Sequence, residues 1–229
     1  MKQDNLWENY QTDFDLLKTF KSSKRYDFIL SQIKGGSSVL NIGIGEGYFE
    51  KKCLEKGINI FSIDPSEKSI ERLKKELNIS SDLFKNGKIE NIPFDSKMFD
   101  YVVACELLEH LDEISLGEGL LEINRVLKNN GYFIGTVPAD ENLSDNEVIC
   151  LHCGKKFHRW GHQRSFSLEN LRNILSKYFK EENIKRVYLF DMKYLNFKGK
   201  FIYLIKKLFL FINIKGSNET YFFKFKKIT

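Results

Sequence analysis

The order of apolar and polar positions along the chain predicts strands that alternate with helices. Short runs of β-branched and aliphatic residues are typical of buried strands, and such runs occupy 38–42, 59–63, 100–104 and 132–137. Stretches with apolar residues at helical spacing lie between them, as at 66–77. This alternation indicates βαβ units around a mostly parallel sheet, so we expect an α/β fold.

Further elements are predicted on both sides of this core. Apolar residues at helical spacing over 6–33 predict one or two N-terminal helices, which end at the pair Gly35 and Gly36. The periodicity weakens after Pro138. The elements predicted beyond that point are a polar segment without clear periodicity, a helix and two strands, at 140–165, 167–179, 186–190 and 220–225.

One further segment, 199–212, is apolar on nearly all sides and is interrupted by Lys206 and Lys207. It is too short and too charged to span a bilayer. We favour a helix that covers an edge of the sheet. The alternative is a helix in a membrane interface, with its lysines reaching the headgroups, which would make the protein a peripheral membrane protein.

A glycine-rich turn follows the first predicted strand, in the sequence VLNIGIGEGY. Glycines let the backbone leave a strand sharply and approach a ligand, and the next helix offers free N–H groups to a pyrophosphate or a carboxylate. Asp64 ends the next strand, 21 residues after Gly43, where a carboxylate can accept hydrogen bonds from ribose hydroxyls. The spacing is G-x-G-x-G, whereas nicotinamide-binding folds prefer G-x-G-x-x-G.

Four motifs, in order over residues 39–138, resemble those of class I S-adenosylmethionine-dependent methyltransferases. They are VLNIGIGEGYFE, SIDPSEKSIERLKK, IENIPFDSKMFDYVVACELLEHLDE and INRVLKNNGYFIGTVP. The resemblance implies S-adenosylmethionine as cofactor. It also implies a Rossmann-like fold with a mostly parallel, twisted, seven-stranded sheet and helices on both faces.

The resemblance also implies roles for matching positions. The three loop glycines would flank the methionine part of the cofactor, and the acidic end of the second strand would bind the ribose. Two residues fall where the family contacts adenine, and two follow the fourth strand under the sulfonium. Asn41 replaces the usual aspartate of the first motif, so a buried carboxylate is lost there. The implied cofactor-binding residues are Asn41, Gly43, Gly45, Gly47, Asp64, Ile89, Glu90, Cys105 and Glu106.

Methyl transfer to a hydroxyl is helped by a base near the line of attack. His110 is the candidate catalytic residue, because it follows Leu108 and Glu109 just after the fourth strand, near the expected cofactor. The alternative is that His110 only packs on the helix there. Glu106 and Asp140 are weaker alternatives as the base.

Cysteine and histidine cluster in the segment CLHCGKKFHRWGHQR. A C-x2-C pair followed by two histidines four residues apart matches the ligand set of a tetrahedral structural zinc site. We therefore predict Zn²⁺ bound by Cys150, Cys153, His158 and His162. One alternative is a three-ligand site whose open position holds the acceptor, and another is a metal-free loop with reduced thiols.

Length and composition favour one domain. We divide residues 1–229 into N-terminal helices, a cofactor-binding core, a Cys/His insertion and C-terminal elements, at 1–36, 37–138, 139–166 and 167–229. The N-terminus has no apolar signal region and the four cysteines do not suggest a disulfide framework, so we expect a cytoplasmic protein.

Charge is divided unevenly between the two ends of the chain. Residues 1–149 hold 18 Lys/Arg and 26 Asp/Glu, a net −8, whereas residues 150–229 hold 18 and 5, a net +13. A basic region attracts phosphates, nucleotides or anionic membranes. We therefore expect O-methylation of a small, anionic acceptor, such as a nucleotide-linked or phosphorylated sugar of surface glycans.

Two other functions remain open from the sequence. One is an NAD(P)-dependent oxidoreductase, since its cofactor also binds a glycine loop. The other is a zinc-knuckle protein that binds RNA without catalysis, although the alternating apolar and Lys residues at the C-terminus are better explained by an edge strand than by a nucleic-acid surface. The oligomeric state is not predicted.

Overall fold

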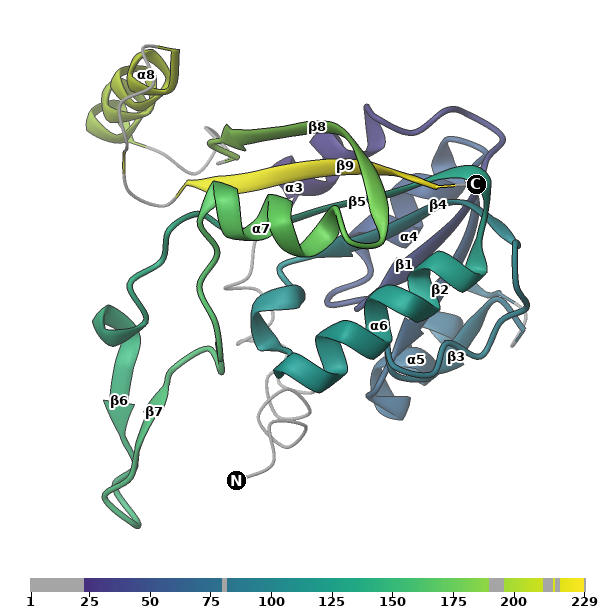
Figure 1. The fold of residues 1–229 in the computed structure, drawn as a ribbon, viewed down its shortest axis with the longest axis horizontal. Helices are drawn as coiled ribbons and strands as arrows, with labels where there is room; N and C mark the ends of the chain where they lie inside the picture. The colour runs from purple at the N-terminus through teal and green to yellow at the C-terminus, as the bar shows by residue number, and fades with distance from the viewer. Residues whose placement is uncertain (1–22, 80–81, 190–195, 212–215, 217–218, 229) are drawn as a thin grey trace.

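A computed structural model describes residues 23–79, 82–189, 196–211, 216 and 219–228 of this chain. It contains a seven-stranded sheet in the order β3-β2-β1-β4-β5-β9-β8, and Figure 1 shows helices packed against both of its faces. The strands from β3 to β5 pair in parallel, and β9 pairs antiparallel with both β5 and β8. The mostly parallel Rossmann-like sheet that the sequence predicts is confirmed.

Seven strands form the main sheet, and two more form a separate hairpin. The strands of the sheet are β1 (Ser38–Ile42), β2 (Asn59–Asp64), β3 (Phe84–Asn86), β4 (Phe99–Cys105), β5 (Leu127–Pro138), β8 (Phe179–Val187) and β9 (Thr220–Lys227). The hairpin consists of β6 (Glu147–Ile149) and β7 (Lys156–His158). The helices are α3 (Ser23–Leu30), α4 (Tyr48–Glu55), α5 (Glu67–Leu77), α6 (Glu113–Val126), α7 (Leu168–Leu175) and α8 (Phe197–Phe211), with the 3-10 turns η1 (Leu108–His110) and η2 (Leu143–Asn146).

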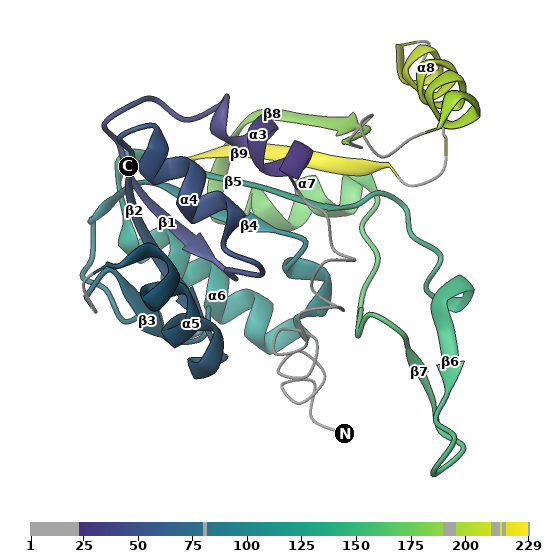
Figure 2. The same cartoon turned by 180° about the vertical axis from the view of Figure 1, so that it is seen from behind.

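The sheet separates two apolar layers, because successive side chains of a strand point to opposite faces. In β1, Val39 belongs to the apolar cluster that includes residues of α3, α4 and α5, whereas Leu40 belongs to the cluster that includes residues of α6 and α7. Figure 2 shows α3, α4 and α5 in front of the sheet, and Figure 1 shows α6 and α7 on the opposite face. Burial on both faces explains why the strands appear as mostly apolar runs in the sequence.

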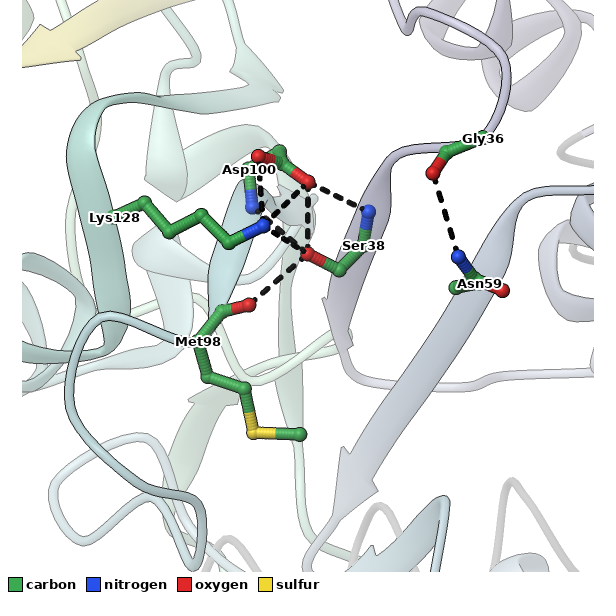
Figure 3. Close-up of polar contacts among 6 residues, drawn as sticks. All are labelled: Gly36, Ser38, Asn59, Met98, Asp100 and Lys128. Carbon is green, nitrogen blue, oxygen red and sulfur yellow. Dashed lines mark hydrogen bonds and ion pairs between the residues drawn. The ribbon is translucent and has the colours of Figure 1, made fainter.

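The amino end of the sheet is fixed by a small polar network (Figure 3). The Asp100 carboxylate accepts hydrogen bonds from the backbone N–H and the hydroxyl of Ser38, both at 2.8 Å, and lies 3.0 Å from Lys128 Nζ. These contacts join the starts of β1, β4 and β5. The opposite, carboxyl edge of the sheet is therefore left for the loops that leave β1, β2 and β4.

Two predicted boundaries near the C-terminal edge are wrong. The helix predicted over 167–179 ends earlier, as α7, and the strand predicted at 186–190 begins earlier, as β8. Ser167 caps α7, because its side chain accepts a hydrogen bond from Asn170 N. β8 is the edge strand of the sheet, and the first half of it is mostly polar because many of its side chains meet solvent there. Apolar periodicity therefore does not predict where β8 begins.

The helix expected to cover the sheet edge does not do so. In both views α8 stands away from the sheet, at one end of the molecule. Most of its large apolar side chains are exposed, including Phe197 at 87% and Phe201 at 61%. No helix among the described residues is long and apolar enough to cross a membrane. The predicted N-terminal helix positions before residue 23 lie outside the described residues.

The segment after β5 leaves the body of the protein as a hairpin and then returns to it (Figure 1). Its ends lie side by side, because Ala139 and Phe166 form an isolated parallel bridge and Asp140 N donates to Phe166 O at 2.9 Å. Asp140 also accepts hydrogen bonds from Arg186 and Tyr221, at 2.9 and 2.8 Å. These contacts give Asp140 a structural role at the base of the insertion.

Candidate cofactor and metal sites

The glycine loop at the carboxyl end of β1 has the conformation that its sequence predicts. Gly43, Gly45 and Gly47 have φ angles of 87°, 51° and 80°, which favour glycine. A Cβ atom added to Gly43 or Gly45 would meet no protein atom within 4 Å, so open space lies in front of the loop. At Gly47 a Cβ would lie 2.4 Å from Leu73 Cδ1, so this glycine allows α4 and α5 to pack closely.

Asp64 and Arg72 hold the loop from the neighbouring elements. Asp64 ends β2, and its carboxylate accepts hydrogen bonds from Ile44 N at 3.0 Å and Ser66 N at 2.8 Å. Arg72 Nη2, from α5, donates to the Gly45 carbonyl at 2.7 Å. Asp64 therefore lies beside the glycine loop, where the ribose contact was predicted. The contact itself stays a prediction.

A buried carboxylate does lie beside Asn41, but α4 supplies it. Asn41 Nδ2 donates to Glu50 Oε1 at 2.7 Å and to the Gly43 carbonyl at 3.1 Å, and Ser62 Oγ donates to the same Glu50 oxygen at 2.8 Å. Burial raises the pKa of Glu50 to about 7, against the effect of these hydrogen bonds. Glu50 is not among the residues predicted from the sequence. Its position two residues after Tyr48, on the first turn of α4, is the signal that places it near the glycine loop.

The other predicted cofactor residues are divided between the site and the core. Cys105 ends β4 and Glu106 follows it at the same sheet edge, and burial raises the pKa of the Cys105 thiol to about 12. Glu106 has a φ of 51° and forms an ion pair with Arg25 of α3 at 3.5 Å, a partner that the sequence did not predict. Ile89 is buried against Gly119 of α6 and Glu90 is half-buried, so their adenine contacts stay predictions.

These residues fit S-adenosylmethionine. The open space at Gly43 and Gly45 can receive the methionine part, and the buried Asn41 Oδ1 has no hydrogen-bond partner among the described residues, so it can accept from an amino group. The loop lies at the start of α4, whose free N–H groups favour a carboxylate.

Comparisons with known proteins point to the same family. A family model described as a methyltransferase domain matches residues 40–135. An uncharacterized methyltransferase of Geobacillus sp. (strain WCH70) is 27% identical over 162 residues, which cover 68% of this chain and 74% of that protein. An uncharacterized protein of Methanocaldococcus jannaschii is 30% identical over 162 residues, which cover 70% of this chain and 61% of that protein. This chain belongs to the class I S-adenosylmethionine-dependent methyltransferases.

Solved methyltransferase structures have the same fold. The N-methyltransferase NodS from Bradyrhizobium japonicum, in complex with S-adenosylhomocysteine, has a TM-score of 0.66 at 16% identity, with all of both chains covered. The 1,6-didemethyltoxoflavin-N1-methyltransferase of Burkholderia thailandensis has a TM-score of 0.68 at 14% identity, with 99% of this chain and 87% of that chain covered. The fold that the sequence motifs indicated is therefore confirmed.

The candidate base of this methyltransferase, His110, lies in a buried position on η1. Burial, and then the charge of nearby His162, lower the pKa of His110 to about 3. Its Nδ1 lies 3.4 Å from the Gly161 carbonyl oxygen. Such an imidazole is neutral near pH 7 but is a weak base, which disfavours the predicted role of His110 as the group that takes the hydroxyl proton.

The four predicted zinc ligands do not come together. β6 and β7 pair Glu147 with His158, so Cys150 lies three residues further along the hairpin, about 10 Å away at the usual rise of a strand. Cys150 and Cys153 lie at the turn of the hairpin, and His162 follows its base. The predicted set is wrong because the spacing alone did not show that the segment between the cysteines and His158 would be an extended strand.

The histidines instead meet carboxylates. Among the described residues, two groups bring three potential ligand atoms within 4.8 Å of one another: Glu141 with His158 and His162, and Glu109 with His110 and His162. All four cysteines are free thiols, and Cys150 and Cys153 join neither of these two groups.

The end of the insertion brings His162 to η1. Gln163 N donates to the Glu109 carbonyl and Gln163 Nε2 donates to the His110 carbonyl, both at 2.8 Å. Arg164 Nε donates to the Leu111 carbonyl at 2.8 Å. Three hydrogen bonds from two consecutive residues thus tie the insertion to the turn that follows β4, and the rings of His110 and His162 lie with their centroids 4.7 Å apart.

Proposed function

We propose that this chain transfers a methyl group from S-adenosylmethionine to a hydroxyl oxygen of a small anionic acceptor, such as a nucleotide-linked or phosphorylated sugar. When bound, the cofactor supplies an electrophilic methyl group: its carbon–sulfur bond breaks as the carbon–oxygen bond forms, giving S-adenosylhomocysteine, a methyl ether and a proton. The observation that carries the proposal is the open space at Gly43 and Gly45, beside the buried carboxylate of Asp64.

The residues of the loop have separate tasks in this proposal. The glycines and the first turn of α4 bind the methionine part, with Asn41 held in place by Glu50. Asp64 accepts hydrogen bonds from the ribose hydroxyls. Orientation is the main contribution of these residues, because in-line displacement needs the oxygen, the methyl carbon and the sulfur in one line.

The charge of the insertion supports an anionic acceptor. Lys155 and Lys156 are exposed on the hairpin, and the Arg159 guanidinium lies 5.0 Å from the centroid of the Trp160 ring. The end of the same insertion lies on η1, which follows the end of β4 where the sulfonium is expected. The insertion thus carries cationic and aromatic residues and ends near the expected methyl, a combination that suits a phosphate-bearing sugar or nucleotide. We propose the cytoplasm as its compartment, which agrees with the free cysteines.

An assay of S-adenosylhomocysteine release tests this function. We expect turnover with acceptors drawn from nucleotide sugars and phosphorylated metabolites, and little with the matching neutral sugars. The double variant Lys155→Ala/Lys156→Ala should raise KM for a charged acceptor several-fold. Its affinity for S-adenosylhomocysteine, which should be unchanged, is the control. Release with neutral or amine acceptors alone would overturn the acceptor class, and binding of NADH in place of S-adenosylhomocysteine would overturn the methyltransferase itself.

We also propose that α8 rests on an anionic membrane surface. Phe197, Phe201, Leu204 and Leu208 follow helical spacing along one side of α8, and each is more than half exposed. Four lysines and no acidic residue accompany this stripe in α8. An exposed apolar stripe with lysines beside it is typical of a helix that lies in the membrane interface.

Vesicle sedimentation measures this contact. We expect the chain to bind vesicles of phosphatidylglycerol several-fold more strongly than vesicles of phosphatidylcholine, and Phe201→Ser/Leu204→Ser to remove most of this binding. The matched control is Ile114→Ser/Leu121→Ser, which removes two equally exposed apolar side chains from α6. Equal binding by both double variants, or a dimer in light scattering that only the α8 variant disrupts, would contradict the membrane proposal.

A further inference from the structure

We propose that Glu109, His110 and His162 form a binding site for a divalent transition-metal ion beside the end of β4. One ligand atom from each residue lies within 4.8 Å of the other two. All three side chains are largely removed from solvent, since the exposed fractions are 1% for Glu109, 8% for His110 and 10% for the His162 side chain. The site stands on this geometry and does not depend on the proposed acceptor.

Glu109 is the strongest indication of a bound cation. Both of its carboxylate oxygens are buried, and neither has a hydrogen-bond partner in the described part of the chain. A second carboxylate, Glu106, lies near enough to repel it. A buried carboxylate without donors is unfavourable, and a cation held between it and two imidazoles would remove that cost.

His162 is oriented as metal-binding histidines usually are. Its Nδ1 lies 2.5 Å from a Glu141 carboxylate oxygen, so this nitrogen donates and Nε2 keeps the lone pair for a metal. A carboxylate behind a histidine fixes its ring and raises its basicity as a ligand. Asn146 Nδ2 in turn donates to Glu141 at 3.1 Å. Glu141 is thus a positioning residue.

The second group of three, which contains His158, suits this supporting role better than metal binding. His158 Nδ1 accepts the backbone N–H groups of His162 and Trp160, at 3.1 and 3.3 Å. Its proton therefore sits on Nε2, which lies 3.4 Å from Glu141 Oε1. Two backbone donors occupy Nδ1, and Nε2 faces Glu141 without making a hydrogen bond, so His158 supports Glu141 only through this electrostatic contact.

Two imidazoles and one carboxylate select the class of metal. This donor set suits Zn²⁺, Mn²⁺, Fe²⁺ or Co²⁺ better than Mg²⁺ or Ca²⁺, which prefer oxygen ligands. Three protein ligands leave at least one position open, as in catalytic metal sites. If the proposed function holds, that open position can bind the acceptor hydroxyl and lower its pKa.

Metal content tests the site directly. The full chain without a histidine tag is stripped with a chelator, dialysed against Zn²⁺, Mn²⁺ or Co²⁺ in turn, and analysed by mass spectrometry of the metal. We expect about one equivalent bound in the wild type. Glu109→Gln and His162→Gln should reduce it to background, and Glu141→Gln should weaken binding about ten- to a hundredfold.

Two controls distinguish this site from a thiolate site on the hairpin and from a loss of folding. Cys150→Ser/Cys153→Ser should retain the full equivalent, and bound Co²⁺ should lack the intense near-ultraviolet band of a cobalt thiolate. Affinity for S-adenosylhomocysteine, measured on each variant, shows whether the fold and the cofactor site survive independently of the metal. Absence of metal in the wild type, or loss of metal only in the cysteine variant, would overturn the proposal without touching the methyltransferase assignment.

Discussion

Gly47→Ala is expected to lower the free energy of unfolding by about 2–4 kcal/mol, the sum of backbone strain and overpacking. Gly47 has a φ of 80°, which an alanine adopts only with strain, and the new Cβ would lie 2.4 Å from Leu73 Cδ1. Leu73 is buried, so relief requires α5 or the loop to move. Because the loop precedes α4, we also expect affinity for S-adenosylhomocysteine to fall about tenfold or more, equal to about 1.4 kcal/mol.

Gly57→Ala is the matched control for this variant. Gly57 also has a positive φ, of 65°, but a Cβ there would meet no atom within 4 Å, and it lies at the other end of α4. It should cost about 1 kcal/mol of stability, from strain alone, and leave cofactor affinity unchanged. Denaturant unfolding and calorimetry with S-adenosylhomocysteine measure both effects. Equal losses in the two variants would show that the close packing against Leu73 is unimportant.

Glu50→Gln is expected to change how the stability of the protein depends on pH. Burial first, and then the nearby Asp64 carboxylate, raise the pKa of Glu50 from 4.5 to about 7 in the folded protein, while hydrogen bonds from Asn41 and Ser62 oppose the rise. The folded state therefore binds more protons than the unfolded state between these values. Stability consequently falls as the pH rises from about 4.5 to about 7.

Glutamine cannot ionise, so residue 50 of the variant should no longer contribute to the fall in stability with rising pH. We expect the difference in unfolding free energy between Glu50→Gln and the wild type to shift in favour of the variant by about 3 kcal/mol across that window. Glu55→Gln is the control, because Glu55 lies on the same helix but is exposed, and its difference from the wild type should be nearly flat. Unfolding titrations at several pH values measure both, and parallel curves for wild type and Glu50→Gln would contradict the buried charge.

Local patterns were sufficient to predict the cofactor-binding core. The strands β1, β2 and β4 are buried on both faces, so each appears as a mostly apolar run, and the glycines after β1 are required by local backbone angles. Asp64 could be placed because the loops that follow parallel strands meet at one edge of the sheet. None of these inferences needs contacts between distant parts of the chain.

The histidine cluster could not be predicted in the same way. The spacing of Cys150, Cys153, His158 and His162 suggested one site, but the hairpin separates the cysteines from the histidines. The partners that His162 does meet, Glu109 and Glu141, lie 53 and 21 positions away along the chain. Only the return of the insertion to η1, through Gln163 and Arg164, brings them together.

By itself, then, the sequence determined the fold family, the glycine loop and the acidic end of β2, because each depends on residue type and short-range spacing. The tertiary structure decided that Glu50 supplies the carboxylate beside Asn41, that α8 stands away from the sheet, and that His162 joins Glu109 and His110. For Glu50 and His162 the physical reason is the same. Side-chain partners of this kind depend on how elements pack in space, and apolar periodicity carries no information about which polar groups will then face one another.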